Sequence, residues 1–108
     1  MASGQNLANP DQPYECYCVI HPYGFMKNAL NKMRCEVSFP SSDSYIKLRD
    51  ENGDVIVFRG EAELFSYMSK RGWEYVDTIV KNADFMYVMK KKVFKDEDAL
   101  EHFIIKED

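Results

Sequence analysis

The chain has 108 residues, of which 45% are hydrophobic and 14% aromatic, and it carries a net charge of -4 from 14 basic and 18 acidic residues. This length and composition fit one small domain with a packed core and argue against a wholly disordered chain. The acidic balance lacks the basic surface with which nucleic-acid binders neutralise phosphates, so a nucleic-acid partner is disfavoured.

The sequence contains no candidate membrane segment. No stretch approaches the roughly 20 apolar residues that cross a bilayer as a helix, and residues 1–13 lack the positive start and apolar run of a secretory signal. We therefore predict a cytoplasmic protein without a membrane partner, although a chain trimmed of its signal peptide would read the same way. Residues 1–13 are polar, carry two prolines and show no periodicity, which predicts a flexible N-terminal arm.

Two segments alternate in the manner of β-strands. In residues 14–21, one face would carry Tyr14, Cys16, Cys18 and Ile20, and the other Glu15, Tyr17, Val19 and His21. In residues 33–39, one face would carry Met33, Cys35, Val37 and Phe39. Residues 22–32, which separate the two segments, contain a proline and a glycine and fit a short helix or a long loop about equally well.

Residues 45–59, "YIKLRDENGDVIVFR", predict a hairpin whose register follows from its hydrophobic pattern. A three-residue loop that ends at Gly53 in the left-handed conformation gathers four apolar residues on one face, pairing Leu48 with Ile56 and Ile46 with Phe58. A two-residue turn would instead mix charged and aromatic side chains on that face. The pattern therefore favours the three-residue loop.

Residues 61–71 predict the main helix, because their apolar residues recur at helical spacing around Leu64 and Met68. Acidic residues fill the first turn and basic residues the last, as the helix dipole favours, and Gly72 stands where a glycine commonly ends a helix.

Three segments follow this helix. Residues 73–80 and 84–93 predict two more strands joined by a turn, and residues 85–89 are apolar on both faces, as in an interior strand. Residues 94–108 predict a C-terminal segment that forms a short helix capped by Asp96, or frays.

Trp73 and Tyr75 fall on one face of the strand that follows the helix. We predict that they pack under the helix beside Phe65 and Met68, because buried aromatic side chains mostly serve cores. The competing hypothesis is an aromatic surface that recognises a ligand.

The stretches "LFSYMSKRGWEYVDTIV" and "FMYVMKKKV" carry a resemblance to known proteins. With the opening "YECYCVI" and the hairpin "DENGDVIVF", the chain resembles small uncharacterised bacterial proteins of intestinal anaerobes over most of residues 14–93. More loosely, it is similar to a widespread bacterial domain-of-unknown-function family with a Gly-Trp-Glu corner between helix and strand. These motifs are structural, so the resemblance implies a fold and no activity.

The sequence contains no recognisable set of catalytic residues. The three cysteines are an odd number in a chain with an adequate core, which favours buried free thiols over a disulfide framework. Two of them are spaced Cys-x-Cys within a strand, unlike the usual zinc knuckle, and the sequence places neither His21 nor His102 beside a thiol. There is no Gly-rich phosphate loop. We therefore predict a protein that is not an enzyme and has no metal site and no cofactor.

Two residue groups remain as candidate sites. A pocket or interaction surface would involve Tyr14, Cys16, Cys35, Trp73 and Tyr75. A basic patch for an acidic partner would involve Lys90, Lys91, Lys92 and Lys95, although these lysines also fit a solubilising strand end.

The sequence as a whole predicts an α+β fold in the order ββββαββ, with residues 14–93 as a single domain. A mostly antiparallel sheet of five or six strands would carry one main helix on one face. The other face would expose Tyr17, Val19, Val55, Val57, Val76 and Val88. Because uncovered apolar faces tend to bind proteins, the leading hypothesis is a non-catalytic interaction module that forms a homodimer or binds another protein. The alternative is a small-molecule or metal binder with a pocket near the cysteine-bearing strands.

Overall fold

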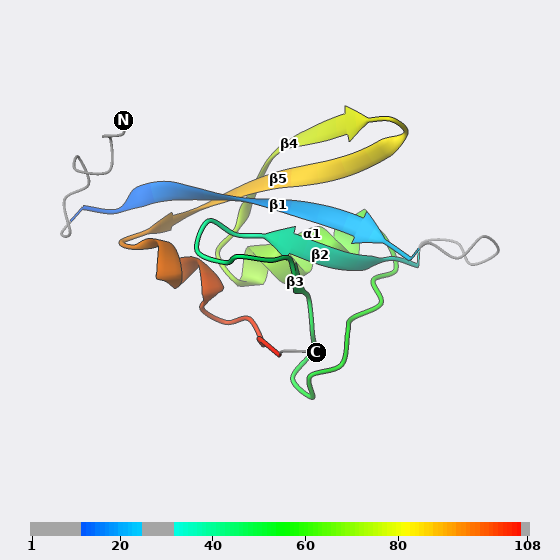
Figure 1. Cartoon of the computed structure of the whole chain (residues 1–108), viewed down its shortest axis with the longest axis horizontal. Helices are drawn as coiled ribbons and strands as arrows, with labels where there is room; N and C mark the ends of the chain where they lie inside the picture. The colour runs from blue at the N-terminus through cyan, green and yellow to red at the C-terminus, as the bar shows by residue number, and fades with distance from the viewer. Residues whose placement is uncertain (1–11, 25–31, 107–108) are drawn as a thin grey trace.

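The computed structural model describes residues 12–24 and 32–106. Within these residues, five strands form one antiparallel sheet in the order β3-β2-β1-β5-β4 (Figure 1). The strands are β1 (Tyr14–Tyr23), β2 (Arg34–Ser38), β3 (Ile46–Lys47), β4 (Glu74–Lys81) and β5 (Asp84–Val93). One α-helix, α1 (Glu61–Lys70), precedes β4, and a 3₁₀ helix, η2 (Asp96–Leu100), follows β5. The predicted α+β class is confirmed.

Two of the predicted segments fall largely outside the described residues. The N-terminal arm was predicted for residues 1–13, of which only 12 and 13 are described. Of the segment 22–32, residues 25–31 likewise lie outside.

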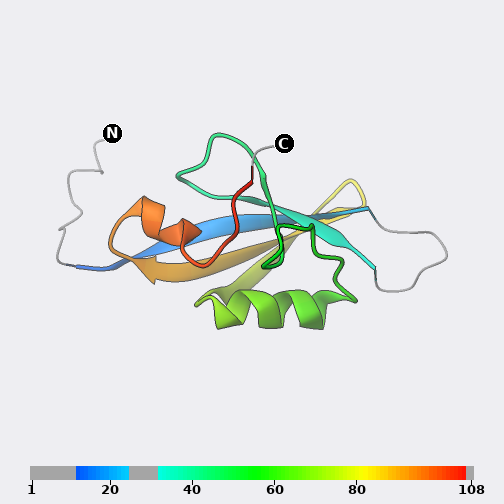
Figure 2. The same cartoon turned by 90° about the horizontal axis from the view of Figure 1, so that it is seen from below.

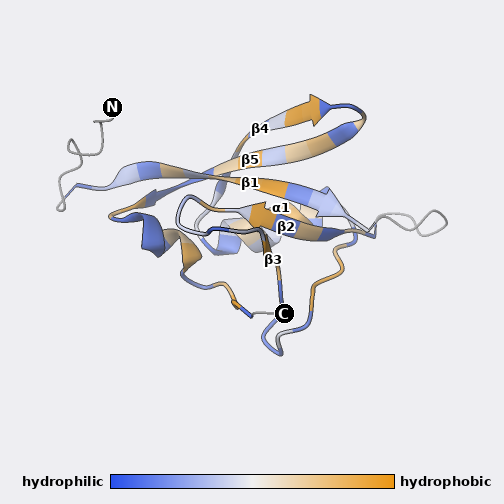
Figure 3. Ribbon diagram, in the orientation of Figure 1, coloured by the Kyte–Doolittle hydropathy of each residue, from blue (hydrophilic) through white to orange (hydrophobic). Residues whose placement is uncertain are grey.

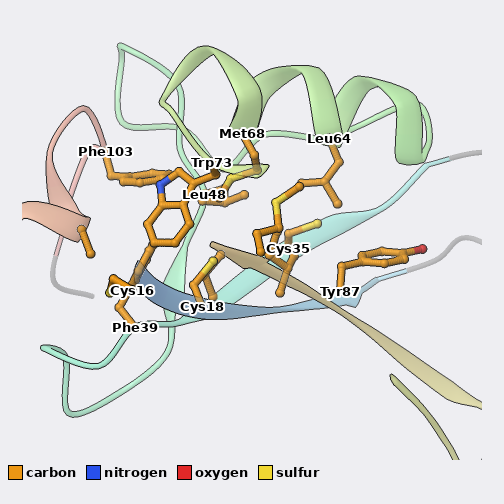
Figure 4. Close-up of a cluster of buried hydrophobic side chains, with 14 of the residues drawn as sticks. Cys16, Cys18, Cys35, Phe39, Leu48, Leu64, Met68, Trp73, Tyr87 and Phe103 are labelled. Atoms are coloured by element: carbon orange, nitrogen blue, oxygen red, sulfur yellow. The ribbon is translucent and has the colours of Figure 1, made fainter. Parts of the chain in front are cut away.

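The core lies between α1 and one face of the sheet (Figure 2). The ring of Phe65 on α1 lies 5.1 Å from that of Tyr87 on β5 and 5.2 Å from that of Tyr75 on β4. Figure 4 shows cysteine side chains of β1 and β2 on the sheet side of the cluster, facing Met68 and Leu64 of the helix. The buried apolar residues are Cys16, Cys18, Ile20, Met33, Cys35, Val37, Phe39, Leu48, Phe58, Leu64, Met68, Trp73, Tyr87, Met89, Val93, Ala99 and Phe103.

A Schellman-type cap ends α1 and turns the chain back onto the sheet. Gly72 has φ +91°, the left-handed conformation that glycine adopts without steric cost. The backbone N–H of Gly72 donates to Ser69 O, and that of Trp73 donates to Met68 O, both at 3.0 Å. Trp73 is thereby buried beside the helix as predicted, whereas Tyr75 contacts Phe65 but remains 45% exposed.

The predicted hairpin has the expected turn and register at its tip. Gly53 has φ +86°, and Arg49 pairs with Val55, which is the register of the predicted Leu48–Ile56 pair. Ile56 N accordingly donates to Leu48 O at 3.0 Å.

The hairpin does not continue as predicted beyond that tip. Phe58 pairs with Met33 and not with Ile46, and Ile46 pairs with Val37 of β2. The fourth predicted strand is therefore absent, and Val55 and Val57 lie outside the five strands. The physical reason is burial: beside Met33, the ring of Phe58 packs edge-on against Tyr67 of α1, with centroids 5.5 Å apart.

The C-terminal segment packs against the open end of the core. Phe103 is 8% exposed, and its ring lies 5.2 Å from that of Phe39. Arg71, just after α1, ties this segment to the helix by donating Nε–H to His102 O at 3.1 Å and Nη1–H to Tyr67 O at 2.9 Å. The residue that caps η2 is Lys95 and not the predicted Asp96.

Candidate functional site

The sheet face opposite α1 carries a row of apolar side chains at its centre. Strand alternation turns Cys16, Cys18 and Ile20 toward the core and Tyr17 and Val19 away from it. The register sets Val19 opposite Val88 of β5, and Met86 of β5 opposite Ile79 of β4. We call Tyr17, Val19, Ile79, Met86 and Val88 the open face. Tyr17 and Ile79 are 47% and 41% exposed, so this row is only partly shielded by its own neighbours.

A group of paired charges borders the open face at one end. Lys90, the register partner of Tyr17, places Nζ 2.9 Å from Glu15 Oε2 and 3.6 Å from Glu74 Oε1. The hydrogen bond that Lys90 donates to Glu15, together with the negative charge of Glu15, raises the pKa of Lys90. Lys92 lies opposite Glu15 on the same face. The charges of these two lysines and two glutamates cancel, and the exposed Asp77 of β4, the register partner of Val88, adds one negative charge on the same side of the sheet.

An aromatic contact borders the open face at the other end. The rings of His21 on β1 and Tyr45, which precedes β3, lie 4.7 Å apart at an interplanar angle of 37°. Tyr45 is 55% exposed. The open face is therefore bounded by aromatic rings at one end and by charges at the other.

The edge strand β4 concentrates exposed apolar surface. Of the eleven large hydrophobic side chains that are exposed in the described part of the chain, four belong to β4: Tyr75, Val76, Ile79 and Val80. Figure 3 shows the apolar end of β4 close to the polar turn into β5. The predicted open-face residue Val76 falls at a register shift between Tyr75 and Asp77.

That register shift is accompanied by local side-chain hydrogen bonds. Asp77 Oδ1 accepts from the backbone N–H of Thr78 at 2.8 Å. The hydroxyls of Tyr75 and Thr78 lie 2.6 Å apart. Because bulges and occupied backbone donors hinder the addition of another strand, the first half of β4 is poorly suited to pair with a partner strand.

The predicted pocket residues are placed mainly in the core. Cys16, Cys35 and Trp73 are 3%, 0% and 2% exposed, so their side chains present almost no surface to a ligand. Tyr14, at the start of β1, donates its hydroxyl to Asp96 Oδ1 of η2. A shallow groove of about 410 Å³ does adjoin Trp73 and Tyr75, but it is lined otherwise by residues of α1 and β5, by Gly72 and by Glu74 of β4.

The buried thiols have low chemical reactivity. Burial raises the pKa of Cys18 and of Cys35 to about 12, and it also raises the pKa of Cys16. A thiol that stays protonated is a poor nucleophile and a poor metal ligand. Within residues 12–24 and 32–106, no three His, Cys, Asp or Glu side chains form a group that could hold a metal ion.

The four lysines of the predicted basic patch do not form one surface: three are divided between the two faces of the sheet, and the fourth lies beyond it. Lys90 and Lys92 lie on the side of the open face, whereas Lys91 lies opposite Cys16, and its Nζ is 6.0 Å from the centre of the Trp73 ring. Lys95 follows β5 and begins η2. Strand alternation, which was already visible in the sequence, is the reason for this separation.

A cavity of about 570 Å³ that sequence reasoning missed lies between the β3 region and the C-terminal segment. We call it the basic cavity. Its lining residues are Ser42, Ser44, Tyr45, Ile46, Lys47, Arg49, Leu100, Ile105 and Lys106. No motif marks these residues, because they come together only when the C-terminal segment folds back beside β3.

No protein-family model, no curated protein and no solved structure matches this chain. None of the helices in the described residues has the length and apolar character needed to span a membrane.

Proposed function

We propose that this protein is a small non-catalytic interaction module that forms a homodimer through the open face. The observation that carries the proposal is the partly exposed apolar row of Tyr17, Val19, Ile79, Met86 and Val88 at the centre of a sheet whose other face is covered by α1. Contiguous apolar surface of this kind is stabilised by contact with another protein.

The charges at the border support a second copy of the same chain as the partner. In a two-fold dimer, each patch meets its own copy, so a patch of one charge sign would repel itself. Here Lys90 is already paired with Glu15 and Glu74. Burying such a pre-paired group avoids the large cost of an isolated buried charge.

A dimer in which the open faces of two copies pack together fits this structure better than a dimer in which their edge strands pair. The register shift in β4 and the hydrogen bond from Thr78 N–H to Asp77 obstruct continuous strand addition along that edge. The open face needs no backbone partner, because its strands are already paired within the sheet. The second half of β4 contributes through Ile79, whose side chain belongs to the open face.

The test is the oligomeric state of three single-residue variants, measured by sedimentation velocity and native mass spectrometry. Tyr17→Glu and Ile79→Glu each introduce a carboxylate into the open face at an exposed position. Val57→Glu is the matched control, because Val57 is 40% exposed but lies outside the five strands. Circular dichroism of each variant checks that the fold is retained.

We expect a wild-type dimer whose dissociation constant rises about tenfold or more in both open-face variants, since burial of an unpaired carboxylate costs at least 1.4 kcal/mol. The control should dimerise like the wild type. A wild-type protein that remains monomeric at its highest soluble concentration would overturn the proposal. Equal weakening by Val57→Glu would place the interface elsewhere.

A further inference from the structure

We infer that the basic cavity binds a small organic anion, a molecule with one carboxylate or phosphate group on an apolar body. Among the residues that the structure describes, three cationic side chains line the cavity, Lys47, Arg49 and Lys106, and no acidic one does. The whole chain has a net charge of -4, so this concentration of positive charge is local. A concave site lined by one sign of charge focuses the field and attracts the opposite charge.

Arg49 is held in place from two directions. It is 7% exposed, and its Nη1–H donates to the backbone oxygen of Gly53 at 2.9 Å. Its own backbone oxygen accepts from the Tyr67 hydroxyl at 3.3 Å. A buried guanidinium fixed in this way loses little conformational freedom when an anion binds, and such pre-organisation favours affinity.

The other two cations come from segments that are far apart in the sequence. Lys47 belongs to β3, where its register partner is Glu36 of β2, which does not line the cavity. Lys106 lies beside the tip of the hairpin, because a Cβ placed on Gly53 would lie 3.8 Å from Lys106 Cδ. The three cations therefore reach the cavity from two segments of the chain, residues 47–49 and the C-terminal segment.

The remaining lining residues indicate an apolar body on the ligand. Ile46, Leu100 and Ile105 supply aliphatic surface, and Ser42, Ser44 and Tyr45 supply hydroxyl groups. The volume of about 570 Å³ falls within the range of roughly 300–1,000 Å³ that is usual for small-molecule sites. Apolar contact with a few fixed polar groups is the common design of such sites.

The experiment is a titration of the full chain followed by ¹H–¹⁵N NMR, with four probes. Phenyl phosphate and benzoate each combine an anionic group with an apolar body. Inorganic phosphate offers the charge alone, and benzyl alcohol offers the apolar body alone. Shifts are read residue by residue, so binding is detected whether or not the protein dimerises, and its outcome is independent of the proposed function.

We expect phenyl phosphate, benzoate or both to bind with shifts at residues 42–49 and 100–106, and the tighter of the two identifies the anionic group. Lys47→Gln and Lys106→Gln should each weaken this binding by about tenfold, a loss of roughly 1.4 kcal/mol. Lys92→Gln changes an exposed lysine on β5 that does not line the cavity, so it should leave this binding unchanged.

Four outcomes would overturn the inference. The first is the absence of shifts in the cavity with either aromatic anion. The second is equal weakening by Lys92→Gln, which would mean attraction to net charge only. The third is binding of benzyl alcohol as tight as that of the anions, which would mean that the cations play no part. The fourth is binding of inorganic phosphate as tight as that of phenyl phosphate, which would mean that the apolar wall plays none.

Discussion

The backbones of Phe58 and Met33 exchange two hydrogen bonds, with N–O distances of 2.7 and 2.9 Å. This pair closes a long loop of sequence, because it joins the chain just before α1 to the start of β2. It also directs the side chain of Phe58 into the core and that of its neighbour Val57 outward: Phe58 is 1% exposed, whereas Val57 is 40% exposed. The pair therefore decides which side chain of this segment enters the core.

We expect Phe58→Ala to lower the free energy of unfolding by about 3–5 kcal/mol, the usual cost of removing a fully buried phenylalanine and leaving a cavity. Chemical denaturation of both proteins measures the difference. The neighbouring Val57→Ala should change the free energy by no more than about 0.5 kcal/mol, as most surface substitutions do. Similar losses in the two variants would mean that the pair with Met33 does not set the burial of this segment.

The Phe58–Met33 pair also separates the features of the fold that the local sequence predicts from those that it does not. The hairpin tip was predictable because Gly53 and the alternation around it favour one register within a few residues. The end of α1 was predictable for the same reason, since Gly72 and the apolar spacing are local signals. Whether Phe58 pairs with Ile46 or with Met33 depends on its packing against α1, which follows later in the chain. The local sequence pattern around Phe58 carries no information on that contact.

The candidate sites differ in the same way. Tyr17, Val19 and Val88 of the open face follow from strand alternation, a local property, and were predicted as exposed. Ile79 and Met86 join them only through the pairing of β4 with β5. The basic cavity depends on the docking of the C-terminal segment through Phe103. Lys106 is far in sequence from Lys47 and Arg49, so this group of cations was not predicted.

The turn between β4 and β5 uses an alanine where glycine would fit better. Asn82 and Ala83 have φ of 52° and 69°, and they connect Lys81 to Asp84, which are paired. Two-residue turns of this kind favour Asn-Gly, because a Cβ in the left-handed conformation costs roughly 1–2 kcal/mol.

We therefore expect Ala83→Gly to raise the free energy of unfolding by about 0.5–1 kcal/mol, after allowing for the greater freedom of glycine in the unfolded chain. Thermal or chemical denaturation measures the change. Ala62→Gly, the same substitution on the exposed side of α1, should lower the free energy by a similar amount. A loss of stability in Ala83→Gly would show that the turn tolerates alanine without strain.

The buried thiols give the fold a defined response to alkaline pH. The pKa of Cys18 and that of Cys35 are each raised by burial from 9.0 to about 12. In the unfolded chain these thiols ionise near pH 9, while in the folded chain they remain protonated. Their contribution to stability is therefore complete below pH 9 and is lost progressively as the pH rises toward 12.

We expect the free energy of unfolding to fall above about pH 9 with a slope that approaches roughly 1.4 kcal/mol per pH unit for each buried thiol. Tyr14 reinforces the loss only at higher pH, because its pKa is raised from 10.0 to about 12, chiefly by its hydrogen bond to Asp96. Urea denaturation between about pH 8 and 10 therefore reports mainly on the thiols. Replacing Cys18 and Cys35 together by alanine should lower the overall stability and flatten this slope. A slope that persists unchanged in the double variant would assign the alkaline response to other groups.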